Sequence, residues 1–197
     1  MTTAIRLVAG LGNVGREYVA TRHNAGFWFA DALAARLGAT FAREPRFFGD
    51  IAKAGTLRIV KPSTYMNLSG QSVAALAHFH TLAAEEVLVV HDELDLKPGE
   101  AKLKLGGGTA GHNGLKDIRA RLGTPDFWRL RFGIGHPRDS EFGAQPVVDY
   151  VLRPPRDDER TAIDAAIDAA LDAWNDIAAG NFERAMLALH TKPKEAP

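Results

Sequence analysis

The 197-residue sequence predicts a single α/β domain: a central twisted, mixed but mostly parallel β-sheet flanked by helices, with a long C-terminal helix. Short apolar runs suited to buried strands alternate with segments of helical periodicity. No Pro/Ser-rich linker divides the chain, and 46% hydrophobic residues are enough for a substantial core. We therefore expect residues 1–197 to form one domain, with residues 190–197 as a disordered tail.

The first half of the chain predicts an initial strand, a helix, a hairpin and a second helix. The two hairpin strands meet at Gly55, so at least one pair of strands in the sheet is antiparallel. Asn24 is a candidate N-cap for the first helix. In order, the expected elements are Ile5–Ala9, Ala25–Leu37, Phe47–Ala54, Leu57–Val60 and Ser72–Phe79.

The second half predicts three strands and three helical segments. Lys102 and Lys104 alternate with apolar residues and face one side of their strand. After Pro154-Pro155, apolar residues recur at helical spacing from Ile163 to Ala178 and predict the long helix. The expected elements before it are the strands Val87–Val90, Ala101–Leu105 and Trp128–Ile134, the helix Asn113–Leu122 and a short amphipathic piece, Val147–Leu152.

Composition narrows the possible functions. The chain has no cysteine, which excludes disulfides, a thiol nucleophile and thiolate metal sites. We find no signal-peptide pattern and no apolar run of membrane-spanning length, so we expect a cytoplasmic protein. The net charge is zero, but residues 96–138 carry nine Lys/Arg and three Asp/Glu, whereas residues 139–197 carry six and twelve. The centre of the chain thus offers a basic face for a nucleic acid, or simply a solvated surface.

Two glycine motifs match GxGxxG, at residues 10–15 and 106–111, and raise the possibility of dinucleotide binding. The first motif is followed by a polar connector, residues 16–24, where that fold requires an apolar helix. Asp31, at the distance expected for a ribose ligand, falls inside a helical pattern. The second motif lacks the lysine that a nucleotide triphosphate needs. The dinucleotide interpretation is therefore weak.

Polar residues at the ends of the expected elements are better candidates for chemistry. His23, Asn67, Asp92 and Asn113 each stand at such an end, and in a mostly parallel sheet these ends gather along one edge. A histidine with a carboxylate provides a base and its orienting partner. Because no serine or cysteine accompanies this pair, the nucleophile implied is water.

Several sequence blocks together resemble the bacterial-type peptidyl-tRNA hydrolase family. They occur in order over about residues 5–190. Val14 departs from the family, which usually has proline there, and Ser140 stands where the family commonly has lysine. The blocks are GLGN with EY and TRHNAG, then MNLSG at 66–70, HDELDL at 91–96, GGGTAGHNGL at 106–115 and RLRFGIGHP at 129–137.

The resemblance implies hydrolysis of the ester bond of peptidyl-tRNA by His23, and it selects Asp92 over Asp95 as the orienting carboxylate. It implies that Asn13 distinguishes a blocked from a free amino group, and that Asn67 and Asn113 bind substrate. Each asparagine could instead serve as a helix cap or turn residue. Tyr18 and Tyr65 correspond to aromatic positions beside the cleft, although simple packing explains them too.

The resemblance also implies peptidyl-tRNA as the partner, a monomer without an obligate protein partner, and no cofactor. We expect no metal, because the other histidines lack metal-ligand spacing. The segment at residues 146–152 is expected to border the cleft as a flap. Two other functions remain open: a nicotinamide-dependent oxidoreductase and a catalytically silent RNA-binding module. The residues placed along the RNA path are Lys102, Lys104, Arg131 and Arg138.

Overall fold

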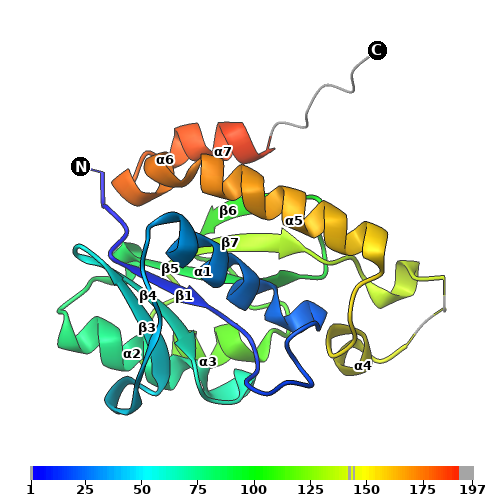
Figure 1. Cartoon of the computed structure of the whole chain (residues 1–197), viewed down its shortest axis with the longest axis horizontal. Helices are drawn as coiled ribbons and strands as arrows, with labels where there is room; N and C mark the ends of the chain where they lie inside the picture. The colour runs from blue at the N-terminus through cyan, green and yellow to red at the C-terminus, as the bar shows by residue number, and fades with distance from the viewer. Residues whose placement is uncertain (1, 142, 144, 191–197) are drawn as a thin grey trace.

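A computed structural model of the chain describes residues 2–141, 143 and 145–190. It contains one seven-stranded sheet with the order β2-β3-β4-β1-β5-β7-β6. The four inner strands, β4, β1, β5 and β7, run parallel, while β2, β3 and β6 join antiparallel at the edges. The predicted single α/β domain with a mixed sheet around a parallel core is confirmed (Figure 1).

The structure gives the following bounds. The strands are β1 (Leu7–Gly10), β2 (Ala42–Glu44), β3 (Gly49–Ala54), β4 (Leu57–Pro62), β5 (Val87–Glu93), β6 (Ala101–Leu105) and β7 (Trp128–Gly133). The α-helices are α1 (Ala25–Arg36), α2 (Ser69–Phe79), α3 (Asn113–Leu122), α4 (Val147–Val151), α5 (Asp157–Asp172), α6 (Trp174–Ala179) and α7 (Phe182–His190). Three short 3₁₀ turns matter for the site: η1 (Arg22–Asn24), η3 (Met66–Leu68) and η5 (Pro137–Asp139).

Helices cover both faces of the sheet and make two apolar cores (Figure 1). On one face, Val8 and Leu88 pack with Phe29 of α1 and with the apolar side of α5 and α6. On the other face, Leu7 and Val89 pack with residues of α2 and α3. Neighbouring strand residues point to opposite faces, which is why the continuous apolar runs of β1 and β5 supply both cores.

The first glycine motif brings α1 against the sheet. A Cβ on Gly10 of this motif would lie 2.4 Å from the carbonyl oxygen of Gly26 in α1, and a Cβ on Gly26 would lie 2.3 Å from the carbonyl oxygen of Val90. Only glycine permits this approach, so the start of α1 lies directly against the ends of β1 and β5. Its role in packing accounts for the glycine without a bound nucleotide.

Several expected boundaries differ from the observed ones. The long C-terminal helix is divided: α5 ends at Asp172, and α6 ends at Ala179. The next residue, Gly180, has φ +80° and lies too close to Thr3 for a side chain. His190, expected to begin a disordered tail, is the last residue of α7, and the rest of that tail lies outside the described residues. The edge strand β2 was not predicted, because its residues are largely exposed and show no apolar alternation.

Within the described part of the chain, none of the helices combines the length and the apolar character needed to cross a membrane.

Candidate active site

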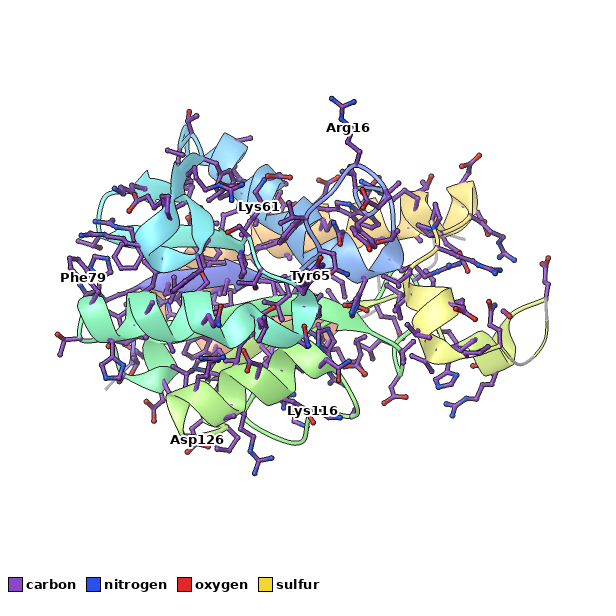
Figure 2. The ribbon with its side chains drawn as sticks, turned by 90° about the horizontal axis from the view of Figure 1, so that it is seen from below. Arg16, Lys61, Tyr65, Phe79, Lys116 and Asp126 are labelled. Carbon is purple, nitrogen blue, oxygen red and sulfur yellow. The ribbon has the colours of Figure 1, made fainter. Side chains whose placement is uncertain are left out.

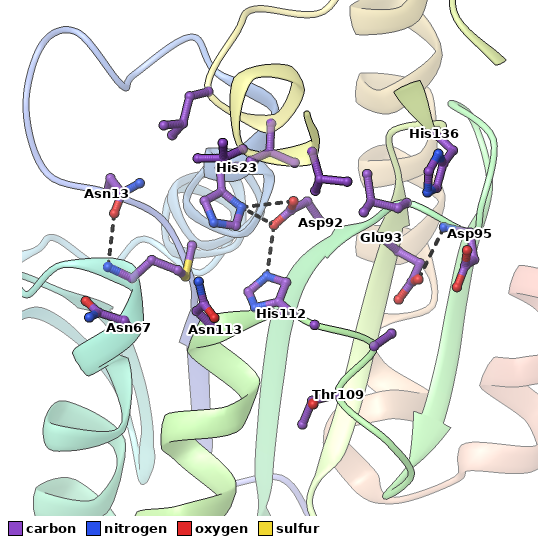
Figure 3. Close-up of a pocket in the computed structure, with 18 of the residues that line it drawn as sticks. Asn13, His23, Asn67, Asp92, Glu93, Asp95, Thr109, His112, Asn113 and His136 are labelled. Atoms are coloured by element: carbon purple, nitrogen blue, oxygen red, sulfur yellow. Dashed lines mark hydrogen bonds and ion pairs between the residues drawn. The ribbon is translucent and has the colours of Figure 1, made fainter. Parts of the chain in front are cut away.

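A cleft of about 790 Å³ opens beyond the carboxyl ends of β1 and β5 (Figure 3). Such ends are where ligands bind in open α/β sheets. The predicted residues that line it are Asn13, His23, Tyr65, Asn67, Asp92 and Asn113. Sequence reasoning placed four of these at element ends, and the fold brings all six into one cavity.

His23 and Asp92 form a close pair at the floor of the cleft. The Nδ1 atom of His23 lies 3.0 Å from both carboxylate oxygens of Asp92. η1 carries His23 just before α1, and Asp92 is the sixth residue of β5, so two adjacent elements supply the pair. With Nδ1 donating to the carboxylate, Nε2 is left as the basic atom of the imidazole.

His112 is a second partner of the same carboxylate. Its Nε2 atom lies 3.1 Å from Oδ1 of Asp92, and its Nδ1 accepts a 3.4 Å hydrogen bond from the backbone of Leu115 at the start of α3. This pattern requires the neutral tautomer with hydrogen on Nε2. His112 was not among the predicted site residues. A position directly before a helix is typical of a cap, which His112 is, and it gives no indication of a contact with Asp92, twenty positions away.

The electrostatics of the pair follow from its burial and its opposite charges. Burial of the His23 ring acts to lower its pKa, but the Asp92 carboxylate outweighs this effect and raises the pKa of His23 above 6.5. Burial would raise the pKa of Asp92, yet His23 and His112 hold that pKa far below its usual range. Asp92 therefore stays ionised, and its charge is available to an imidazolium.

A third histidine, His91, lies behind this group. Its ring centroid is 5.1 Å from that of His112, and its Nδ1 donates to the Asp92 carbonyl at 2.8 Å. Burial, followed by the effect of His112, lowers the pKa of His91 to about 3. His91 is thus neutral at physiological pH, and it adds no positive charge to the surroundings of Asp92.

Asn13 is held in one orientation by two neighbours (Figure 3). Its backbone nitrogen donates to Oδ1 of Asn24 at 2.8 Å, and its carbonyl accepts from Nδ2 of Asn24 at 3.0 Å. Its Oδ1 accepts from the backbone nitrogen of Met66 at 3.0 Å. Because this oxygen is engaged, the amide NH₂ is the group left free for a ligand.

Asn24 therefore does not act as the expected N-cap: its side chain makes no capping bond to α1 and holds the backbone of Asn13 instead. These two bonds fix the turn next to Val14, which is exposed. The turn thus has a fixed conformation although the residue after Asn13 is not proline. Asn24 thus supports the position of Asn13. The sequence pattern around Asn24 predicted only a helix cap.

Asn67 and Asn113 present free amides to the cleft. Both are exposed, and neither side chain bonds to another described residue. Asn67 belongs to η3, and Asn113 is the first residue of α3. The nearby start of α2 is fixed to α3, because the backbone nitrogen of Gly70 donates to Asp117 at 2.8 Å. The two amides thus lie on elements that are joined to each other.

One side of the cleft is apolar. α4 contributes Val147, Val148 and Val151, and Leu152 follows directly. Val147 and Val148 are 42% and 58% exposed, so both present apolar surface at the cleft. The segment expected to border the cleft therefore does so, as a short helix.

The remaining predicted residues lie outside the cleft. Tyr18 is half-buried in the connector after β1 and does not line the cavity, whereas Tyr65 lines it and is 73% exposed. Lys102 and Lys104 lie opposite Arg131 and Arg129 on the paired strands β6 and β7. Figure 2 shows Tyr65, directly before η3, and Lys116 on α3, on the side that faces the viewer.

The four cations of β6 and β7 share one face of the sheet, opposite to Leu103 and Leu130, which belong to the core with α1 and α5. Arg129 is buried and donates to the carbonyls of Gly106 and Gly108, so it holds the glycine loop. Arg131 pairs with Glu93 at 3.2 Å. Lys102 and Lys104 have no ion-pair partner among the described residues. Arg138 belongs to η5 and is a separate, exposed cation.

The ligand atoms of His23, Asp92 and His112 all lie within 4.8 Å of one another, close enough to consider a metal ion. The hydrogen bonds of the two histidines to Asp92 already use these atoms. A metal would have to remove both ring hydrogens and redirect the carboxylate. The residues fit a hydrogen-bonded base better than a metal centre.

Comparison with known proteins links this geometry to one family. The model of the family described as peptidyl-tRNA hydrolase matches residues 7–196. A peptidyl-tRNA hydrolase of Bordetella petrii is 60% identical over 195 residues, covering 97% of this chain and 92% of the relative. That of Polynucleobacter asymbioticus is 56% identical, with 95% and 98% covered. The crystal structure of peptidyl-tRNA hydrolase from Acinetobacter baumannii has a TM-score of 0.89 at 43% identity, with 96% of each chain covered.

Proposed function

The chain belongs to the peptidyl-tRNA hydrolase family and hydrolyses peptidyl-tRNA, and from this premise we propose that His23 is the general base of the reaction. The observation that carries the proposal is the bond from Nδ1 of His23 to the buried carboxylate of Asp92, in a cleft with three asparagine amides. This pair supports a catalytic role for His23 and Asp92 and a substrate-binding role for the asparagines.

In the proposed reaction, Nε2 of His23 takes a proton from a water molecule as the water oxygen attacks the ester carbonyl carbon. The bond between that carbon and the terminal ribose oxygen then breaks, and the same proton passes from His23 to the ribose oxygen. The products are tRNA with a free hydroxyl and a peptide carboxylic acid, which releases the second proton of the water to solvent and becomes a carboxylate. Asp92 fixes the tautomer and stabilises the imidazolium that forms between the two steps. His112 fixes Asp92 in turn.

We assign two tasks to the asparagines. Asn13 presents only its NH₂ group, so it can donate to a carbonyl of the peptidyl group. It has no free oxygen that could accept a hydrogen bond from an ammonium. A free aminoacyl group is therefore a poorer ligand than a blocked one. Asn67 and Asn113 have free amides that can donate to the developing oxyanion, where one well-placed donor contributes about 3 kcal/mol.

We further propose that the tRNA runs over the basic face of β6 and β7. Lys102 and Lys104 are free to contact phosphates, and Glu93 orients Arg131 from the cleft side. Arg138 would meet a separate part of the RNA. Tyr65, exposed beside Asn67, is placed to stack on the terminal base. Tyr18 lies away from the cavity, which supports a weaker role in binding.

We also propose that the enzyme acts as a monomer, because the proposed steps need only the cleft residues of this chain. Peptidyl-tRNA is formed during translation, which supports the cytoplasm as the place where the enzyme acts. No cofactor enters the proposed steps, because the water, the base and the leaving oxygen account for every bond that changes.

The proposal is tested by single-turnover hydrolysis of N-blocked aminoacyl-tRNA with enzyme in excess, in ¹⁸O-labelled water. Direct attack by water places ¹⁸O in the released carboxylate, and the mass of the quenched enzyme stays unchanged. A peptidyl adduct on the enzyme, or ¹⁸O incorporated into Asp92, would instead indicate a nucleophile of the protein. The unblocked aminoacyl-tRNA is the parallel substrate and should be cleaved more slowly.

A further inference from the structure

Arg22, next to His23 in η1, is a buried cation that takes no part in the proposed chemistry. Its side chain is 8% exposed, and a buried charge is costly unless it is paired. Its Nη2 atom lies 2.9 Å from Oε2 of Glu159, in the first turn of α5. This ion pair alone uses only one end of the guanidinium.

The other end of Arg22 holds α4. Nη1 donates to the carbonyl oxygens of Tyr150 and Arg153 at 3.2 and 3.4 Å, and the guanidinium carbon lies 4.0 Å from the centre of the Tyr150 ring. The backbone nitrogen of Arg22 also donates to the Arg153 carbonyl at 3.1 Å. The last carbonyls of a helix lack helical partners and carry partial negative charge, so a cation there stabilises the helix end.

α4 is also attached through Tyr150 and Val151, which are buried in the apolar core, and through one more hydrogen bond. The hydroxyl of Tyr150 donates to the Ile134 carbonyl at 2.7 Å, just beyond the end of β7. Since α4 has only five residues, its own hydrogen bonds cannot fix its position. The position of Val147, Val148 and Val151 over the cleft therefore depends on Arg22 and Tyr150.

We propose that Arg22 is a positioning residue that fixes α4 as the apolar wall for the peptide, at a set distance from His23. The inference rests on the proposed function, because it takes the cleft beside His23 as the place of the peptidyl group. The short turn η1 then contains both the base, His23, and Arg22, whose bonds fix the position of α4. The consequence is that Arg22 governs affinity for the peptide part of the substrate, and not affinity for the RNA.

The test uses Arg22→Lys, because an ammonium keeps the charge but cannot bond in two directions and stack at the same time. The matched control is Arg36→Lys. Arg36 also joins the region of α1 to α5, through Asp172 at 3.3 Å, but it is exposed and does not contact α4. Thermal unfolding establishes that each variant is folded.

In Arg22→Lys, KM for a tRNA that carries a blocked apolar tripeptide should rise about tenfold, as expected when hydrogen bonds from a charged group weaken. Its kcat should stay within about twofold, because Asp92 holds His23 independently. Inhibition by deacylated tRNA should not change. Hydrogen exchange of residues 147–153 should become about tenfold faster without substrate, while that of α5 stays the same. Arg36→Lys should match the wild type in every assay.

A fall in kcat with unchanged KM, or faster exchange in α5 as well, would overturn the inference and make Arg22 a support of His23 or of the whole fold. Unchanged exchange in residues 147–153 would also overturn it. If Arg22→Lys does not fold, Glu159→Gln applies the same test, with the same changes at smaller size. Turnover by His23→Ala in the same assay tests the proposed function separately, since hydrogen exchange needs no substrate.

Discussion

The Nδ1 atom of His23 lies 3.0 Å from both carboxylate oxygens of Asp92, although 69 positions separate the two residues in the sequence. The contact exists because the glycine-rich segment places η1 against the carboxyl end of β5. A buried carboxylate with two imidazole partners stays ionised and favours the protonated ring. The pair thus accounts for how a histidine in this chain can receive a proton from water and hold it briefly.

The pH dependence of turnover follows from the raised pKa of His23. The base must be neutral, so kcat/KM should fall as pH decreases, with a midpoint above 6.5. In Asp92→Asn the carboxylate that raises this pKa is gone, so the midpoint should move to lower pH, and kcat should drop by up to roughly 10⁴-fold. Rates measured across pH for both proteins give the two midpoints. A midpoint that does not move would separate Asp92 from the titration of His23.

Substrate discrimination should depend on the NH₂ group of Asn13. In Asn13→Asp, one carboxylate oxygen can keep the bond from Met66, and the other replaces the NH₂ group with an acceptor that attracts an ammonium. The ratio of kcat/KM for blocked over unblocked aminoacyl-tRNA should fall by roughly 5- to 150-fold, equivalent to about 1 to 3 kcal/mol. If both substrates lose activity by one factor, Asn13 acts only in holding the turn.

RNA binding should depend on the cations of β6 and β7. Lys104→Ala and Arg131→Ala should each weaken binding of tRNA and reduce the slope of log affinity against log salt by about 0.7 to 0.9. A minimal peptidyl-nucleotide without the acceptor stem should be cleaved at the normal rate. Arg43→Ala is the control, because Arg43 lies in β2 at the opposite edge of the sheet. Equal losses of activity on both substrates would instead mean that these residues support the fold or the chemical step.

Removal of divalent metals should leave the chemistry intact. The minimal peptidyl-nucleotide is again the suitable substrate, because folded tRNA itself needs magnesium. After dialysis against EDTA, its hydrolysis should remain within about twofold of the untreated rate, since a base that activates water needs no bound metal. Loss of activity that one equivalent of zinc restores would instead assign His23, Asp92 and His112 to a metal centre.

Local patterns predicted much of this structure. The strand Ala101–Leu105 and the helix Asn113–Leu122 have the observed bounds, because strict alternation and a glycine after the last turn mark their limits. The strand before Asp92 extends further than predicted, through Glu93, since β7 continues to pair with polar residues that an apolar pattern excludes. Pairing with a neighbour, and not side-chain character, sets that boundary.

Apart from the pair of His23 and Asp92, the long-range partners were not predictable. His112 and Asn24 each show a capping signal, yet the bonds that matter go to Asp92 and to the backbone of Asn13. In the sequence, Arg22 is one of several charged residues of a polar connector. In the fold it is buried against α4, where it contacts Tyr150, 128 positions away. A polar side chain has several possible partners, and the packing of the helices against the sheet decides which one it contacts. Local sequence patterns do not contain that information.

The most direct test of the account is His23→Ala, measured for hydrolysis of N-blocked aminoacyl-tRNA and for binding of deacylated tRNA. Phosphate contacts supply most of the affinity, whereas the imidazole acts in the transition state. We expect kcat to fall by about 10²- to 10⁴-fold, while the Kd for tRNA stays within about twofold. Turnover close to that of the wild type, with the fold intact, would contradict the assignment of His23 as the base.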